Sequence, residues 1–263
     1  MKKIFFILLG TVLLASCTFT VNPEALKNAE YNSNYANASR YTCGGGTAPA
    51  TIEDLEINWV SGNVVIEAYD GTEVEFSETC DKALNDTTSL YYLLDDNGTT
   101  LTIQYGRAKS KVKMADLSKD LLIRVPRQMR LEDIEVNGAG YDAVLKGIRC
   151  ESLECNSVST DITLEKCTVE SVEVNGVDDK LTATFEQMPD DIELNGVNSE
   201  AVLYVPETAG MTIETAGMAT DMRSELPVAK NGHKRIVGDG SCDIELNGVN
   251  CNLDVKVMNV NSE

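Results

Sequence analysis

The sequence predicts an all-β fold, a single-stranded right-handed β-helix or β-roll solenoid with coils of about 19–20 residues. One phrase, apolar–Glu–apolar–Asn–small, begins at residues 134, 153, 172 and 192; a further copy begins at 244 and a degraded one at 213. Apolar and polar residues alternate within each copy, which is the period of a strand with one buried face. A second alternating run follows each copy. Every coil therefore offers two strands, and their apolar side chains need neighbouring coils to bury them.

A leucine-rich-repeat-like solenoid is the alternative, because Leu131-x-x-Ile134-x-Val136 resembles the strand of that repeat. Here, however, the asparagine follows the last apolar residue directly, whereas that repeat places two residues between them. The return segment of each coil also has the period of a strand rather than that of a helix. Both differences favour the β-helix. A small residue, usually glycine, ends each phrase and is expected to form the corner.

The first residues resemble a bacterial lipoprotein signal. Met1-Lys2-Lys3 is basic, residues 4–15 are apolar, and Leu14-Ala15-Ser16-Cys17 is similar to a lipobox. The apolar run is too short to favour a membrane-spanning helix. The resemblance implies that residues 1–16 are removed and that Cys17 is lipidated, with palmitate as one expected acyl chain. The residue after Cys17 is Thr18 rather than aspartate. The outer membrane is therefore expected, with periplasmic and surface-facing orientations both open.

The rest of the chain divides into three parts. Residues 17–50 are rich in Asn, Ala, Tyr and Ser and predict a lipid-anchored tether, whose end packs on the first coil. Residues 51–258 form the solenoid, and 259–263 a short tail. Between residues 213 and 244 the period is too long, which predicts a projecting loop or hairpin over 224–241. Other expected features are a hairpin, or two successive coil edges, around Asp96-Asn97-Gly98, a strand at 121–126 that Pro126 ends, and a last coil at 242–257.

Several phrases resemble a bacterial adhesin-like family of unknown function, whose members include β-helix lipoproteins. They lie at 55–66, 122–126 and 238–249, and combine alternating strands with Ser-Gly corners and an Ile-x-Val-Pro stop. The resemblance covers roughly 51–258. It implies a non-catalytic β-helix domain on a cell-envelope protein, used for interaction or adhesion.

Charge restricts the partners. The formal net charge is −20, which opposes binding to nucleic acid, because phosphate contacts need Lys and Arg. The expected contacts are a membrane, reached through the lipid anchor, and an unidentified protein or glycan. An envelope protein with a structural or signalling role, which binds another protein through 224–241, is one alternative function.

Two ladders of polar side chains follow from the repeat. The glutamates share one outward position and should stack, which predicts a solvated acidic face. A Ca²⁺-binding ladder is the alternative, although the nonapeptide of calcium-binding β-rolls is absent. Its candidate ligands are Glu135, Glu154, Glu173 and Glu193. The asparagines that follow them are expected to form a structural ladder.

Cysteines and histidine limit the chemistry. Seven cysteines follow Cys17, so they cannot all pair within one chain. Cys43 with Cys80, and Cys242 with Cys251, are possible disulfides. No C-x-x-C occurs and His233 is the only histidine, so neither a zinc site nor any cofactor is expected. We predict that the protein is not an enzyme. The alternative is a polysaccharide-active enzyme that uses two carboxyl groups about 5–10 Å apart in a groove.

Overall fold

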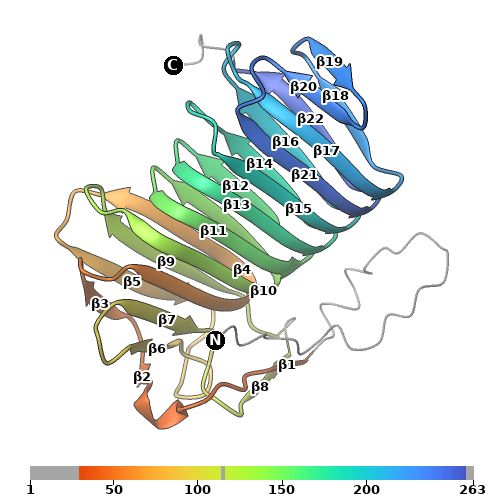
Figure 1. The fold of residues 1–263 in the computed structure, drawn as a ribbon. Coiled ribbons are helices and arrows are strands. Elements are labelled where there is room, and N and C mark those ends of the chain that lie inside the picture. Colours follow the sequence, from red (N-terminus) through yellow and green to blue (C-terminus); the bar gives the residue numbers. More distant parts are fainter. Residues whose placement is uncertain (1–29, 114–115, 259–263) are drawn as a thin grey trace.

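The computed structural model describes residues 30–113 and 116–258. Within them the chain forms strands, turns and one short 3₁₀ helix, η1 (Ala38–Arg40). The strands stack as the rungs of a solenoid whose two parallel ladders enclose an apolar core (Figure 1). The predicted all-β solenoid is therefore confirmed. The return segment of each coil is a strand, which excludes the leucine-rich alternative.

The repeat sets the register of the first ladder. Ile134, Leu153, Val172 and Ile192 lie side by side in successive rungs and are 0–1% exposed. The central rungs of this ladder are β4 (Asp54–Tyr69), β10 (Leu131–Lys146), β11 (Arg149–Val158), β13 (Thr168–Val177) and β15 (Asp191–Val197). The second ladder contains the later halves of β4 and β10, then β12 (Asp161–Glu165), β14 (Lys180–Thr184) and β16 (Glu200–Val205).

The rungs do not follow the order of the sequence at either end. β15 pairs with β21 (Cys242–Val249), and the other edge of β21 pairs with β17 (Met211–Met218). Likewise β22 (Asn252–Val257) lies between β16 and β18 (Asp221–Ser224). The coil at 242–257 was expected to be the last, but it is inserted one rung before the end. At the other end β4 is inserted in the same way, between β10 and the pair β7 (Thr100–Gln104) and β9 (Lys119–Pro126).

This order explains the weakened repeat at 213–217. Thr215 and Ser224 occupy inward positions that are apolar in the neighbouring rung, where Leu246 and Val255 are their partners. A terminal rung has a neighbour on one side only, so its inward side chains meet water. Polar residues at these positions suit the outer face of a capping repeat.

The expected glycine corner is wrong. The glycines of the phrase lie within the strands, and the corners are formed by residues with left-handed backbones, among them Asp178, Asn198 and Asn250 with φ of 57–58°. Glycine is required for a different reason. A Cβ on Gly138 would lie 1.6 Å from the carbonyl oxygen of Trp59, and one on Gly248 would lie 1.9 Å from that of Gly196.

Antiparallel strands close the N-terminal end of the solenoid. β5 (Glu73–Cys80) pairs with β9, and the predicted hairpin is present as β6 (Tyr91–Leu94) with β7. Part of the expected tether is structured. β3 (Gly46–Pro49) pairs with β5, β2 (Thr42–Cys43) with β6, and β1 (Glu30–Asn32) with β8 (Lys111–Lys113).

The segment 224–241 contains the expected projecting hairpin, β19 (Val228–Asn231) and β20 (Lys234–Val237), and β20 pairs with the start of β17. His233 is exposed in its turn. Across residues 30–113 and 116–258, no helix has the length and apolar character needed to cross a membrane.

Candidate interaction face

The asparagine ladder is present on the outward side of the first ladder. Asn156 Nδ2 donates to Asn137 Oδ1 at 3.0 Å, Asn175 donates to Asn156 at 3.0 Å, and Asn195 donates to Asn175 at 2.9 Å. Asn247 extends the chain of bonds to Asn195. The amides therefore join rungs that are far apart in the sequence, and the predicted structural role is confirmed.

Several of these asparagines also hold a glutamate. Asn137 donates to Glu135 at 3.0 Å, and the pairs Asn156–Glu154 and Asn175–Glu173 are each 2.9 Å long. These three glutamates point outward as predicted, but they are half-buried and fixed rather than spread in solvent, whereas Glu245 is exposed. Burial raises the pKa of Glu135, the bond from Asn137 opposes this, and the nearby charges of Glu56 and Glu154 add to it. The result is a preorganised surface of carboxylates and amides, here called the Glu–Asn face, with its glutamates at 56, 135, 154, 173, 193 and 245.

The Ca²⁺ ladder stays a prediction. In the described part of the chain, no group of three or more His, Cys, Asp or Glu side chains has an arrangement that could hold a metal ion. On this face one carboxylate comes from each rung, and its nearest polar partner is an amide donor.

Removing one amide should weaken the stack measurably. We expect Asn175→Ala to lower the free energy of unfolding by about 1–2 kcal/mol, because Asn156 and Glu173 each lose a donor and Asn195 loses an acceptor. Urea unfolding would measure this as a lower midpoint at unchanged slope. Asn231→Ala in the exposed hairpin is the control and should change the midpoint little. Equal midpoints for the two variants would contradict a structural ladder.

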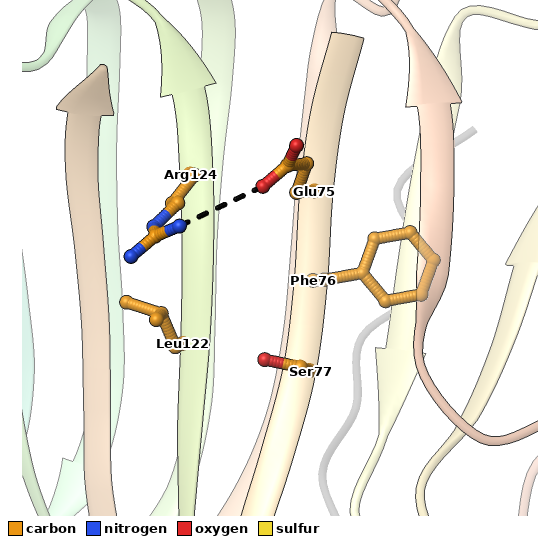
Figure 2. A pocket seen from close by; sticks show the side chains of 5 residues that line it. All are labelled: Glu75, Phe76, Ser77, Leu122 and Arg124. Atoms are coloured by element: carbon orange, nitrogen blue, oxygen red, sulfur yellow. Dashed lines mark ion pairs between the residues drawn. The ribbon is translucent and has the colours of Figure 1, made fainter. Parts of the chain in front are cut away.

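Two shallow hollows lie elsewhere on the surface. The first has a volume of about 120 Å³, and Figure 2 shows its lining by Glu75, Phe76, Ser77, Leu122 and Arg124. Arg124 is also paired with Glu67 at 3.0 Å. The second has a volume of about 280 Å³ and is lined by Glu200, Asp221, Arg223, Asn252, Leu253 and Asp254. Both are smaller than the roughly 300–1,000 Å³ of a typical ligand pocket. Neither offers the enclosed groove that a polysaccharide-active enzyme needs.

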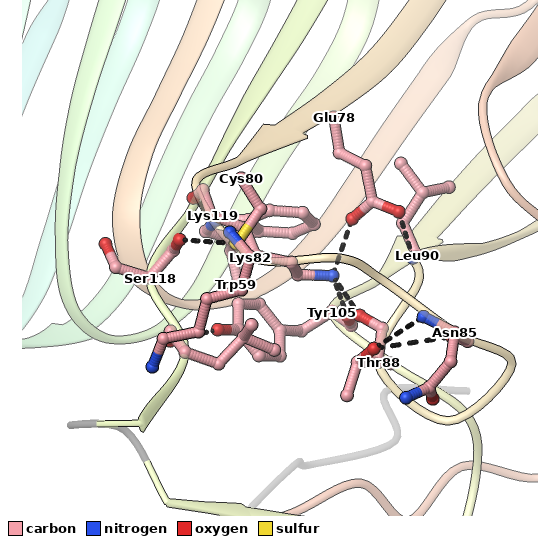
Figure 3. Close-up of polar contacts among 12 residues, drawn as sticks. Trp59, Glu78, Cys80, Lys82, Asn85, Thr88, Leu90, Tyr105, Ser118 and Lys119 are labelled. Atoms are coloured by element: carbon pink, nitrogen blue, oxygen red, sulfur yellow. Dashed lines mark hydrogen bonds and ion pairs between the residues drawn. The ribbon is translucent and has the colours of Figure 1, made fainter.

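A buried lysine lies where the N-terminal strands meet the solenoid (Figure 3). Lys119 is 0% exposed, and its Nζ donates to Glu78 Oε2 at 2.6 Å and to the carbonyl oxygens of Thr88 and Tyr105. The ammonium also faces the rings of Trp59 and Tyr105, 4.9 and 4.3 Å from their centroids. Burial lowers the pKa of Lys119, and the bond to Glu78 opposes that shift. With every donor occupied, this cluster is structural. Trp59, itself buried, packs inside rather than offering a sugar platform.

A buried carboxyl group lies under one corner of the solenoid. Asp179 is 2% exposed; its Oδ1 accepts from the backbone N–H of Thr160 at 3.0 Å. Its Oδ2 has no hydrogen-bond partner, nor do the hydroxyls of Ser157 and Thr160. Burial raises the pKa of Asp179 to about 7. Neither Asp179 nor Lys119 was predicted from the sequence. The usable signal for Asp179 was its position, which is occupied in other coils by small buried residues, Thr160, Ser199 and Cys251.

The cysteines are free thiols in the described residues. The predicted Cys242–Cys251 disulfide is not formed in this structure: Cys242 begins the extended strand β21 and Cys251 lies two residues beyond its end, whereas disulfides need Cα atoms within about 7 Å. Cys43 and Cys80 are also unpaired here, exposed and half-buried respectively. Burial raises the pKa of Cys150 to about 12, which makes that thiol unreactive. Cys17 lies outside the described residues, so its lipidation stays a prediction.

Fold and surface together define an all-β solenoid that presents an ordered polar face. A family model described as Toastrack DUF4097 matches residues 52–259, and the chain belongs to that family. No curated protein matches the chain.

Solved structures resemble the chain at low identity. A putative cell adhesion protein from Clostridium sporogenes is 14% identical, with 83% of this chain and 98% of that chain covered and a TM-score of 0.45. A putative adhesin from Bacteroides fragilis is 12% identical, with coverages of 83% and 97% and a TM-score of 0.39. A putative lipid binding protein from Parabacteroides distasonis is 13% identical, with coverages of 82% and 96% and a TM-score of 0.39.

Proposed function

We propose that this protein is a lipid-anchored component of the bacterial cell envelope, held at the outer membrane through Cys17, whose solenoid mediates non-catalytic interaction or adhesion. The Glu–Asn face carries the proposal. Its carboxylates are fixed by amides before any partner arrives, so little side-chain freedom remains to be lost on binding. Such a face suits a partner with regularly spaced cationic or hydroxyl groups, on a protein or a glycan.

Lipidation at Cys17 and adhesion are tested together in bacteria that express the full chain. A fatty acid with an alkyne tag should label the native protein and should not label Cys17→Ala, because the thiol that carries the acyl chain is gone. Cells with the native chain should adhere to protein- or glycan-coated surfaces more strongly than cells without it. Labelling that persists in Cys17→Ala would contradict the anchor. Adherence equal to that of cells lacking the protein would contradict the adhesive role.

A further inference from the structure

The solenoid ends on an open edge at the rung formed by β17 and β18. Within the described residues, β18 pairs with β22 only, and the outer side of β17 is paired only at Met211–Ile213, with β20. Residues 214–218 and 221–224 thus present unpaired backbone groups, which are a template for another strand. Met218 in this stretch is 68% exposed. We propose that this edge binds the same edge of a second copy of this chain, so that two solenoids join end to end about a two-fold axis.

The charges on β18 select one register. Asp221 and Arg223 point outward, and Met222 points inward in line with Leu253. In an antiparallel pair, residues directly opposite each other share one face of the sheet, so a symmetric pair must be centred on a residue. A pair centred on Asp221 or on Arg223 would oppose like charges. Centring on Met222 places each Asp221 opposite Arg223 of the second copy, which is the favourable arrangement.

Pairing of β17 with its own copy is compatible with the same two-fold axis. Ala219 forms the corner between the strands, with φ of 57°, and Ala216 and Met222 lie three residues before and after it. A two-fold axis perpendicular to the sheets can therefore pass through Ala216 on one ladder and Met222 on the other. Both strands then face their own copies at once, with residues 215–217 and 221–223 opposite the same residues of the second copy, while Glu214 keeps its ion pair with Lys234 of the hairpin.

The local charges also favour a second copy of the chain as the partner of this edge. Arg223 is 80% exposed in its side chain and Asp221 is 62% exposed, and their contact within one chain is a loose 3.8 Å. Asp221 lines the acidic hollow that also contains Glu200 and Asp254. In the proposed pair, Arg223 of the second copy lies beside this hollow. Each copy thus adds a second arginine to the other copy's hollow, whose lining holds three carboxylates and one arginine, Arg223.

A charge swap tests the pairing on the full-length chain in detergent, with its mass followed by sedimentation velocity. The native chain should dimerise. Arg223→Glu or Asp221→Arg should each raise the dimer dissociation constant about tenfold or more, because two symmetric attractive contacts become repulsive. The double variant Asp221→Arg/Arg223→Asp restores opposite charges and should dimerise again. A monomeric native chain, or single variants that dimerise as well as the native chain, would overturn the proposal.

A crosslink tests the axis itself. Directly opposite residues of an antiparallel pair have Cα atoms about 4.5–5.5 Å apart, within the range of a disulfide. Ala216→Cys should therefore form a covalent dimer on oxidation in intact membranes, visible on a non-reducing gel. Glu245→Cys, one rung further in, is the matched control and should give no more dimer than the native chain. Equal crosslinking of the two variants would contradict the register.

Discussion

Replacing Lys119 with methionine is expected to lower the free energy of unfolding by about 3–5 kcal/mol. The substitution keeps most of the apolar stem but removes the ammonium. It leaves the Glu78 carboxylate, whose side chain is 7% exposed, without its counter-ion. The carbonyl oxygens of Thr88 and Tyr105 lose a donor as well. Urea unfolding followed by circular dichroism would measure the loss.

Two controls make this result specific to a buried pair. Lys146→Met removes the exposed Lys146–Glu165 contact of 3.4 Å and should cost less than about 1 kcal/mol. Adding Glu78→Gln to Lys119→Met should recover part of the loss, because the amide oxygen can still accept from Leu90 N–H while the buried charge disappears. A loss for Lys119→Met no larger than that for Lys146→Met would contradict the structural role.

Asp179 is expected to give the protein an unusual dependence on pH. The folded state keeps its proton up to about pH 7, whereas an unfolded aspartate loses it near about 3.9. Between those values the folded state binds more protons, so the free energy of unfolding decreases as pH rises. The total decrease from this group is about 4 kcal/mol, and the stability it contributes is fully present only at acid pH.

Asp179→Asn should remove this dependence and stabilise the protein above pH 7. The amide oxygen can still accept from Thr160 N–H, and the amide nitrogen adds a donor among the unpaired oxygens of Ser157 and Thr160. Unfolding measured at pH 5 and pH 8 would show the difference. Asp161→Asn, at an exposed position, is the control. If the free energy of unfolding of the native chain falls no more between pH 5 and pH 8 than that of Asp179→Asn, the role assigned to Asp179 is contradicted.

The repeat made much of the fold predictable. Because Ile134, Leu153 and Val172 recur at one spacing, the period fixes the register, the inward face and the ladder of Asn156 and Asn175. Pro126 and the Asn97-Gly98 turn similarly marked a strand end and a hairpin.

The order of the rungs was not predictable in this way. Spacing shows that 213–217 and 244–248 are both copies, but it cannot show which one has a neighbour on each side. The inward Thr215 is the clue, since a polar residue at an apolar position suits a terminal rung. The sequence around Lys119 contains no comparable sign that this residue is buried. A lysine next to an apolar strand usually faces water, and its partner Glu78 lies 41 residues away.

The Glu–Asn face is the central claim, and adherence of cells that display the full chain tests it most directly. The triple variant Glu154→Gln, Glu173→Gln and Glu193→Gln removes three charges but keeps oxygens that the asparagines can bond. Its control, Asp142→Asn, Asp161→Asn and Glu200→Gln, removes the same charge from exposed positions of the second ladder. We predict that adherence falls in the first variant and persists in the second. Equal adherence of the two variants would contradict the assignment of binding to this face.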